Sequence, residues 1–116
     1  MSDNPIYGYL ETLPKEYRVS DFHMRSGSPL AMRVNGEIEV LQDLPITHDL
    51  LDALFREELS DEDYDKFCET RDIDFAMTVA GQRFRANGYH TMRGWALILR
   101  TIVTDVPNID QLGLPQ

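Results

Sequence analysis

The feature that most constrains the fold is a change of hydrophobic periodicity at Asp72. From there, apolar residues occupy every second position: Ile73, Phe75, Met77 and Val79. Strict alternation is typical of a strand with one buried face. Gly81 then favours a tight turn, and two more strands are predicted over 83–91 and 95–103. The C-terminal half is therefore predicted to form a three-stranded antiparallel unit.

The N-terminal half shows a helix pattern followed by strand patterns. Apolar residues fall at helical spacing over 6–17, and Pro14 is expected to end or bend that helix. Three strands are then predicted, over residues 21–25, 30–34 and 37–41. The last two flank Asn35-Gly36, a pair that readily takes the positive φ angles of a tight hairpin turn.

Two helices are predicted between the two groups of strands. Thr47 can cap the first, whose apolar face consists of Leu50, Leu51, Leu54 and Phe55. Ser60 can cap the second, whose inward residues are expected to be Tyr64, Phe67 and Cys68. This order indicates an α+β domain with a largely antiparallel sheet of about six strands, flanked by helices. No internal repeat or Gly/Ser-rich linker interrupts residues 1–116, which are expected to form a single domain.

Composition excludes several classes of protein. With 42% hydrophobic and 27% charged residues, the chain is neither disordered nor fibrous. A single cysteine, Cys68, rules out an internal disulfide framework and fits a reducing cytoplasm. No run approaches the ~18 apolar residues of a membrane span, and the N-terminus has no signal-peptide pattern. The net charge of −9 disfavours binding to nucleic acid.

The charge is nevertheless unevenly distributed along the chain. Residues 75–104 contain no acidic side chain but four arginines: Arg83, Arg85, Arg93 and Arg100. All 20 acidic side chains lie elsewhere. A basic stretch within an acidic chain indicates a site for an anion. The alternative is that solvated arginines happen to lie on one hairpin.

Two of these arginines are predicted to face each other. If the last hairpin turns at residues 92–93, Arg85 lies directly opposite Arg100. Like charges at opposed positions destabilise a sheet, unless an anion lies between them. Guanidinium groups match phosphate oxygens bidentately, so a phosphate fits this description. The alternative is that Asp72 or Asp74, on the neighbouring strand, neutralises the pair.

Other patterns of catalytic chemistry are weak or missing. Neither lysine follows a glycine, so there is no phosphate-binding P-loop, and the chain alone is expected not to hydrolyse nucleotides. Ser20, Asp21 and His23 are neighbours on one strand and cannot form a catalytic relay. Asp21 and His23 share a strand face, where they could bind a metal ion or form a structural polar cluster. The second interpretation is favoured, and no metal site is predicted.

Several short sequence motifs occur along the chain in a fixed order. Each motif alone is weak evidence for a protein family, but the ordered set is specific. They are Pro29 and residues 20–24 (SDFHM), 33–36 (RVNG), 84–87 (FRAN), 93–94 (RG), 99–102 (LRTI) and 109–115 (IDQLGLP). Together they resemble the N-terminal domain of PilT-type twitching-motility ATPases, the retraction motors of type IV pili within the secretion ATPase superfamily. The resemblance covers residues 19–115. Val103-Thr104 stands where the family usually has a proline.

The resemblance implies a PAS-like fold and a regulatory, nucleotide-sensing role in a hexameric motor. Arg85 and Arg100 resemble arginine fingers that reach toward ATP phosphates, with Arg93 assisting. ATP and Mg²⁺ are implied for the whole protein, without tight binding to residues 1–116. The implied partners are the protein's own C-terminal ATPase domain, neighbouring subunits of the ring and the pilus inner-membrane platform protein. The implied location is the cytoplasm, peripheral to the inner membrane, and residues 107–116 resemble the start of the linker to the ATPase core.

Two other functions remain open from the sequence. The chain could be a free-standing PAS-like module that senses a small ligand or docks a partner. It could also be the equivalent domain of a secretion or pilus-assembly ATPase, because the matching stretches discriminate poorly within the superfamily.

Overall fold

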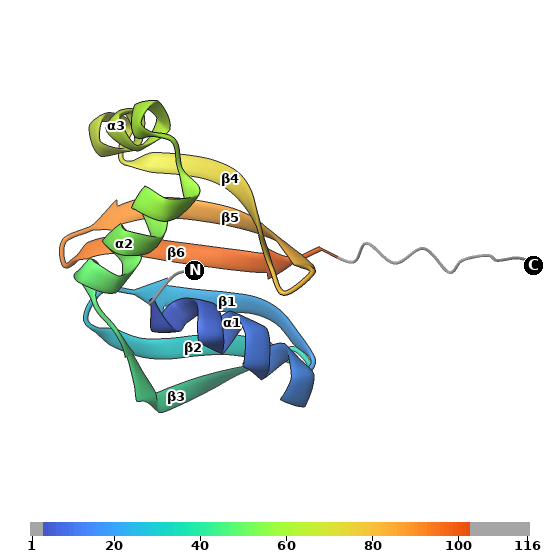
Figure 1. The fold of residues 1–116 in the computed structure, drawn as a ribbon. Helices are drawn as coiled ribbons and strands as arrows, with labels where there is room; N and C mark the ends of the chain where they lie inside the picture. Colours follow the sequence, from blue (N-terminus) through green and yellow to red (C-terminus); the bar gives the residue numbers. More distant parts are fainter. Residues whose placement is uncertain (1–3, 103–116) are drawn as a thin grey trace, which may run out of the picture.

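A computed structural model describes residues 4–102, which form one six-stranded sheet and three helices (Figure 1). The predicted α+β class and element order are confirmed. The elements are α1 (Pro5–Glu16), β1 (Val19–Arg25), β2 (Ser28–Val34), β3 (Glu37–Ile46), α2 (His48–Glu58), α3 (Asp61–Thr70), β4 (Asp72–Val79), β5 (Gln82–Thr91) and β6 (Gly94–Thr101).

The sheet consists of two antiparallel meanders joined side by side. Its strand order is β3-β2-β1-β6-β5-β4, so the first and last strands of residues 4–102 pair with each other. All pairings are antiparallel. Figure 1 shows α1 and α2 lying over the same face of this sheet. The opposite face, called the open face here, is not covered by any helix within the described residues.

Side-chain caps explain where the helices begin. The Thr47 hydroxyl accepts a hydrogen bond from the Leu50 N–H at 3.2 Å, and the Ser60 hydroxyl accepts one from the Asp63 N–H at 3.1 Å. Both predicted caps are therefore confirmed. Pro14 lies inside α1, which continues to Glu16. The helix thus continues for only two residues beyond its proline.

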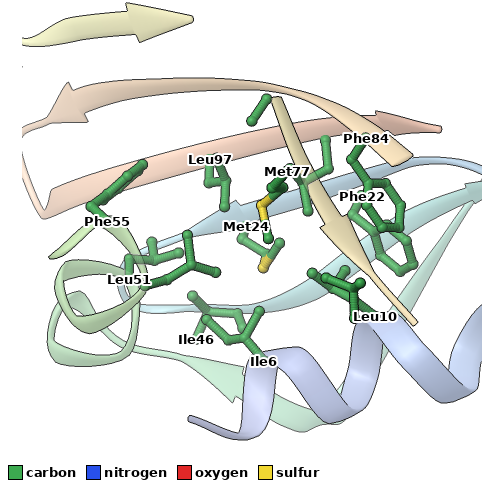
Figure 2. Packing of buried hydrophobic residues seen from close by; sticks show 14 of the residues in the cluster. Ile6, Leu10, Phe22, Met24, Ile46, Leu51, Phe55, Met77, Phe84 and Leu97 are labelled. Atoms are coloured by element: carbon green, nitrogen blue, oxygen red, sulfur yellow. The ribbon is translucent and has the colours of Figure 1, made fainter. Parts of the chain in front are cut away.

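The core lies between the helices and the covered face of the sheet (Figure 2). Ile6 and Leu10 of α1 and Leu51 and Phe55 of α2 are fully buried against sheet residues. The sheet contributes alternate residues of its central strands, chiefly Phe22, Met24, Phe84, Leu97 and Leu99. Burial at every second position leaves the intervening side chains on the open face.

Two sequence expectations need correction here. Cys68 was expected to point inward, but it is exposed. Phe67 fills the core position of α3, and the next residue of a helix points about 100° away from it. The third strand was expected to end near residue 41, but β3 continues to Ile46. Its register against β2 shifts between Pro29 and Leu30, and this irregularity accommodates the extra length.

The exposed thiol leads to a simple prediction. Cys68 in the native protein is expected to react with a thiol reagent at a rate within about an order of magnitude of that in urea, because the folded chain does not shield it. Stopped-flow measurement with a chromogenic disulfide reagent gives both rates. Reaction only after unfolding would contradict the exposure of this side chain.

The predicted end of the last strand and the C-terminal segment fall at the limit of the described chain. The last strand ends at Thr101, and Ile102 is the final described residue. The expected linker over 107–116, and the family-like stretch within it, lie outside the described residues.

Candidate functional site

The register of the last hairpin brings Arg85 and Arg100 together, as predicted. These two residues are Cα partners in the β5–β6 ladder, whose turn lies at residues 92–93. Their neighbours Phe84, Ala86 and Leu99 are buried on the covered face. Both arginines therefore point from the open face, where they are exposed.

A hollow of about 220 Å³ lies beside this pair and is called the arginine hollow here. Its lining includes Asp74, Arg85, Asn87, Ile98 and Arg100. Within residues 4–102, the Arg85 side chain makes no hydrogen bond or ion pair. Two guanidinium groups at the edge of one hollow present several N–H donors, and those of Arg85 have no acceptor within residues 4–102; such donors suit phosphate or carboxylate oxygens.

Asp21 is the acidic residue that contacts Arg100, and this contact was not predicted from the sequence. In β1 it is the Cα partner of both Arg33 in β2 and Arg100 in β6. Its carboxylate lies 3.4 Å from Arg100 Nε and 4.0 Å from Arg33 Nε. Asp21 is 8% exposed. One carboxylate thus contacts two arginines and leaves the charge of Arg85 unbalanced.

Neither Asp72 nor Asp74 forms an ion pair with Arg85 or Arg100 within residues 4–102, although Asp74 lines the arginine hollow. Their carboxylates accept hydrogen bonds from the Asn87 side-chain amide, at 3.1 Å and 3.0 Å. Both pair with β5 rather than β6, because β4 lies at the edge of the sheet, beyond β5. The contact between Asp21 and Arg100 depends on the pairing of β1 with β6, which no local sequence pattern specifies.

Arg93 lies apart from this pair. It is in the β5–β6 turn, whereas the Arg85–Arg100 pair is six residues along the ladder, about 20 Å at ~3.4 Å per residue. One Arg93 guanidinium nitrogen donates to the Gly27 carbonyl oxygen at 3.5 Å. A role of Arg93 in nucleotide binding therefore requires contact with a different part of the nucleotide.

His23 and Asp21 lie on the open face of β1, as the alternation predicts. The Asp21 carboxylate contacts arginines, and the buried His23 Nε2 has no hydrogen-bond partner within residues 4–102. Over the same residues, no group of three or more His, Cys, Asp or Glu side chains is arranged to hold a metal ion. Of the two residues expected to form a polar cluster, Asp21 has polar partners, whereas His23 Nε2 has none within residues 4–102.

A second polar cluster fixes the strand that carries Arg100. The Asp52 carboxylate of α2 accepts hydrogen bonds from the Tyr64 hydroxyl of α3, from Trp95 Nε1 at 3.0 Å and from Arg56 Nε at 2.8 Å. Burial alone would raise the pKa of Asp52, but these three hydrogen bonds outweigh it and lower that pKa. Burial and the hydrogen bond to Asp52 both raise the pKa of Tyr64. These hydrogen bonds therefore connect α2 and α3 to β6.

The structure defines an α+β domain whose helices cover one side of an antiparallel sheet and whose other side carries a pair of opposed, exposed arginines. Comparison with known proteins refines that class. No protein-family model matches the chain. It is 32% identical over 96 residues to the type IV pilus retraction ATPase PilT of Pseudomonas aeruginosa, covering 82% of this chain and 28% of that protein. It is 33% identical over 104 residues to the uncharacterized protein YggR of Escherichia coli, covering 89% of this chain and 31% of YggR.

Solved structures agree with the sequence comparison. The pilus retraction motor PilT with bound ADP superposes with a TM-score of 0.74 at 31% identity, over 92% of this chain and 32% of that one. The Legionella pneumophila ATPase DotB superposes with a TM-score of 0.66 at 19% identity, over 92% of this chain and 32% of that one, which shows the shared fold alone. The chain is an N-terminal domain of the PilT-type secretion ATPases.

The chain spans less than a third of the length of the PilT and YggR relatives that it matches. Within residues 4–102, no helix combines the length and hydropathy needed to cross a membrane.

Proposed function

We propose that this domain supplies Arg85 and Arg100 to the ATP site of a type IV pilus retraction motor of the PilT type. The observation that carries the proposal is the pairing of these two arginines across β5 and β6, with Arg85 unpaired and both side chains exposed beside one hollow. In this proposal, the hollow lies against a nucleotide bound on an ATPase domain that is not part of residues 1–116.

The chemistry of the pair suits phosphoryl transfer. Negative charge develops on the phosphoryl oxygens as the terminal phosphate is transferred, and guanidinium groups stabilise it most when water is excluded. Arg85 is free to make a bidentate contact. Arg100 keeps a charged partner in Asp21, which holds its side chain over the sheet. We assign Arg85 the direct phosphate contact and Arg100 a supporting contact.

The domain would act as a gate for hydrolysis. Closure onto a loaded ATPase core brings the arginines to the phosphates, and opening withdraws them. ATP with Mg²⁺ would be bound mainly by that core, while the residues present here fit the phosphate charge. The proposed assembly is a hexameric ring in the cytoplasm, docked on the inner-membrane platform of the pilus, in which this domain contacts its own core and neighbouring subunits.

The test is ATP hydrolysis by the full-length ATPase that carries this domain. Arg85→Ala and Arg100→Ala are each expected to lower kcat at least tenfold, since fingers act on the transition state. The KM for ATP should change less than kcat, because the core retains its own contacts with the nucleotide. Assembly is checked in parallel by size-exclusion chromatography with light scattering.

Arg83→Ala is the matched control, because Arg83 is exposed on the same strand two residues from Arg85 and does not line the arginine hollow. It is expected to hydrolyse ATP within about twofold of the parent protein. Unchanged kcat in both Arg85→Ala and Arg100→Ala, with intact assembly, would overturn the finger assignment.

A further inference from the structure

A second cationic hollow lies at the other end of the last hairpin. It measures about 340 Å³ and is called the turn hollow; its lining is Arg25, Ser26, Ser28, Thr91, Met92 and Arg93. The β1–β2 turn and the β5–β6 turn meet there. No acidic side chain lines it, and neither arginine takes part in an ion pair within residues 4–102.

Gly27 explains how Arg93 reaches this place. A Cβ atom at Gly27 would lie 3.3 Å from Arg93 Cδ and 3.4 Å from Arg93 Nη1, so the missing side chain leaves room for the arginine. The Gly27 carbonyl oxygen also accepts the hydrogen bond from Arg93 at 3.5 Å. Gly27 has a φ of 86°, a value that glycine adopts without strain. The guanidinium group is thereby held over the β1–β2 turn.

The hydroxyl groups of the turn hollow differ in availability. The Ser26 hydroxyl donates to the Trp95 carbonyl oxygen at 2.7 Å, and the Thr91 hydroxyl donates to the Gly94 carbonyl oxygen at 2.9 Å. The Ser28 hydroxyl has no such bond within residues 4–102 and remains available. Two guanidinium groups and one free hydroxyl form a donor set that matches the three oxygens of a phosphate monoester.

Another hollow adjoins the turn hollow on the open face. It measures about 330 Å³ and is called the sheet hollow; its lining is His23, Met24, Arg25, Ser28, Pro29, Ala31, Ile38, Tyr89 and Ile98. Arg25 and Ser28 line both hollows, so the two hollows adjoin at these residues. No acidic side chain lines the sheet hollow either.

The sheet register explains the depression. Arg25 and Tyr89 are the Cα partners of Ala96 on its two sides, and the small Ala96 side chain is buried between them. Ala31 lies opposite His23 in the same way. Small residues between large ones leave a slot with the aromatic ring of Tyr89 in its lining. His23 lines this slot, and its buried Nε2 atom has no hydrogen-bond partner within residues 4–102. Buried polar atoms normally have such a partner, so a ligand that supplies one would be favoured here.

We propose that the two hollows form one binding site for a small molecule in which a phosphate monoester is attached to a flat ring. The phosphate lies between Arg25 and Arg93 in the turn hollow. The ring lies in the sheet hollow against Tyr89 and Ile98, where a polar ring atom can bond His23 Nε2. This site shares Ile98 with the arginine hollow but includes neither Arg85 nor Arg100, and it does not depend on the role proposed for those two residues.

The test is an NMR titration of residues 1–116 with three probes at constant ionic strength: inorganic phosphate, phenol and phenyl phosphate. Phenyl phosphate is expected to bind at least tenfold more tightly than either fragment, because only it fills both hollows. Amide shifts are expected at Ala31 and Tyr89, which line the sheet hollow and not the arginine hollow. Equal affinity for phosphate and phenyl phosphate, or shifts confined to the surroundings of Arg85 and Arg100, would overturn the proposal.

Two variants with the same loss of charge sharpen the test. Arg25→Ala removes the residue shared by both hollows and is expected to weaken phenyl phosphate binding at least tenfold. Arg18→Ala removes an exposed arginine that lines neither hollow, and it should leave the affinity within twofold of the parent. Equal weakening by both variants would show a general charge effect and refute the site. Titration of the parent with AMP then identifies the ring: tighter binding than phenyl phosphate assigns the site to nucleotides, and weaker binding assigns it to simpler aryl phosphates.

Discussion

Replacing Phe55 with Ala is expected to lower the free energy of unfolding by about 3–5 kcal/mol, the cost of emptying a fully enclosed aromatic position. Phe55 of α2 is completely buried. Its ring centroid lies 4.7 Å from that of Phe67 and 5.9 Å from that of Trp95. The Phe55 side chain of α2 therefore packs against both α3 and β6. Urea unfolding followed by tryptophan fluorescence measures the loss through the single Trp95.

A second substitution makes this prediction specific to the packing around Phe55. A Cβ atom at Gly88 in β5 would lie 2.6 Å and 2.7 Å from two atoms of the Phe55 ring, and neighbouring aromatic rings restrict movement of that ring. Gly88→Ala alone is therefore expected to cost about 1–3 kcal/mol. In the Phe55→Ala background, the same change should cost much less, because the two closest contacts are then gone and only the one with Phe67 Cζ, at 3.2 Å, remains. Additive losses in the double variant would contradict this account.

Replacing Asp52 with Ala is expected to destabilise the domain by about 2 kcal/mol at neutral pH. The loss arises because the donors Trp95 Nε1 and Tyr64 O–H lose their common acceptor in a partly buried place. Glu57→Ala is the matched control on the same helix. Glu57 is exposed, and its removal should change stability by less than about 0.5 kcal/mol.

The stabilising effect of Asp52 should also depend on pH. Its pKa is lower in the folded protein, despite the opposing effect of burial, because the Tyr64, Arg56 and Trp95 hydrogen bonds favour the ionised form. The stabilisation is therefore complete above the unfolded pKa, near ~4, and is lost as the pH falls through the lower folded pKa. The stabilities of the parent and of Asp52→Ala should converge in acid. A constant difference between pH 7 and pH 2 would show that the carboxylate charge is not involved.

Local patterns predicted most of the fold, because short-range chemistry determines its elements. The caps at Thr47 and Ser60 and the hairpin register at residues 92–93 depend on neighbouring residues alone, and all three are confirmed. The exposure of Cys68 was missed, since an apolar thiol near a helix face does not reveal which side of that face it occupies. Hydrophobic periodicity predicts which face of a helix is apolar, whereas tertiary packing decides which residues at the edge of that face are buried.

The candidate site was half predicted, for a similar reason. The opposition of Arg85 and Arg100 follows from one turn, so the sequence contains it. The Asp21 contact requires β1 to lie beside β6, and residues 79 apart in the chain carry no local signal of that pairing. The turn hollow likewise joins two hairpin ends from different halves of the sheet. Sites built across the seam between β1 and β6 are visible only in the folded arrangement.

This seam also governs when the protein can fold during its synthesis. The strand β1 leaves the ribosome early, yet its partner on one side is β6, the last strand of the described chain. Until β6 has been made, one edge of β1 carries unpaired backbone groups, which are open to pairing with other chains. Closing a loop of this length is slow compared with forming a hairpin. The complete sheet therefore forms only after β6 has left the ribosome, and until then the nascent β1–β2–β3 meander is the segment that most needs protection from aggregation.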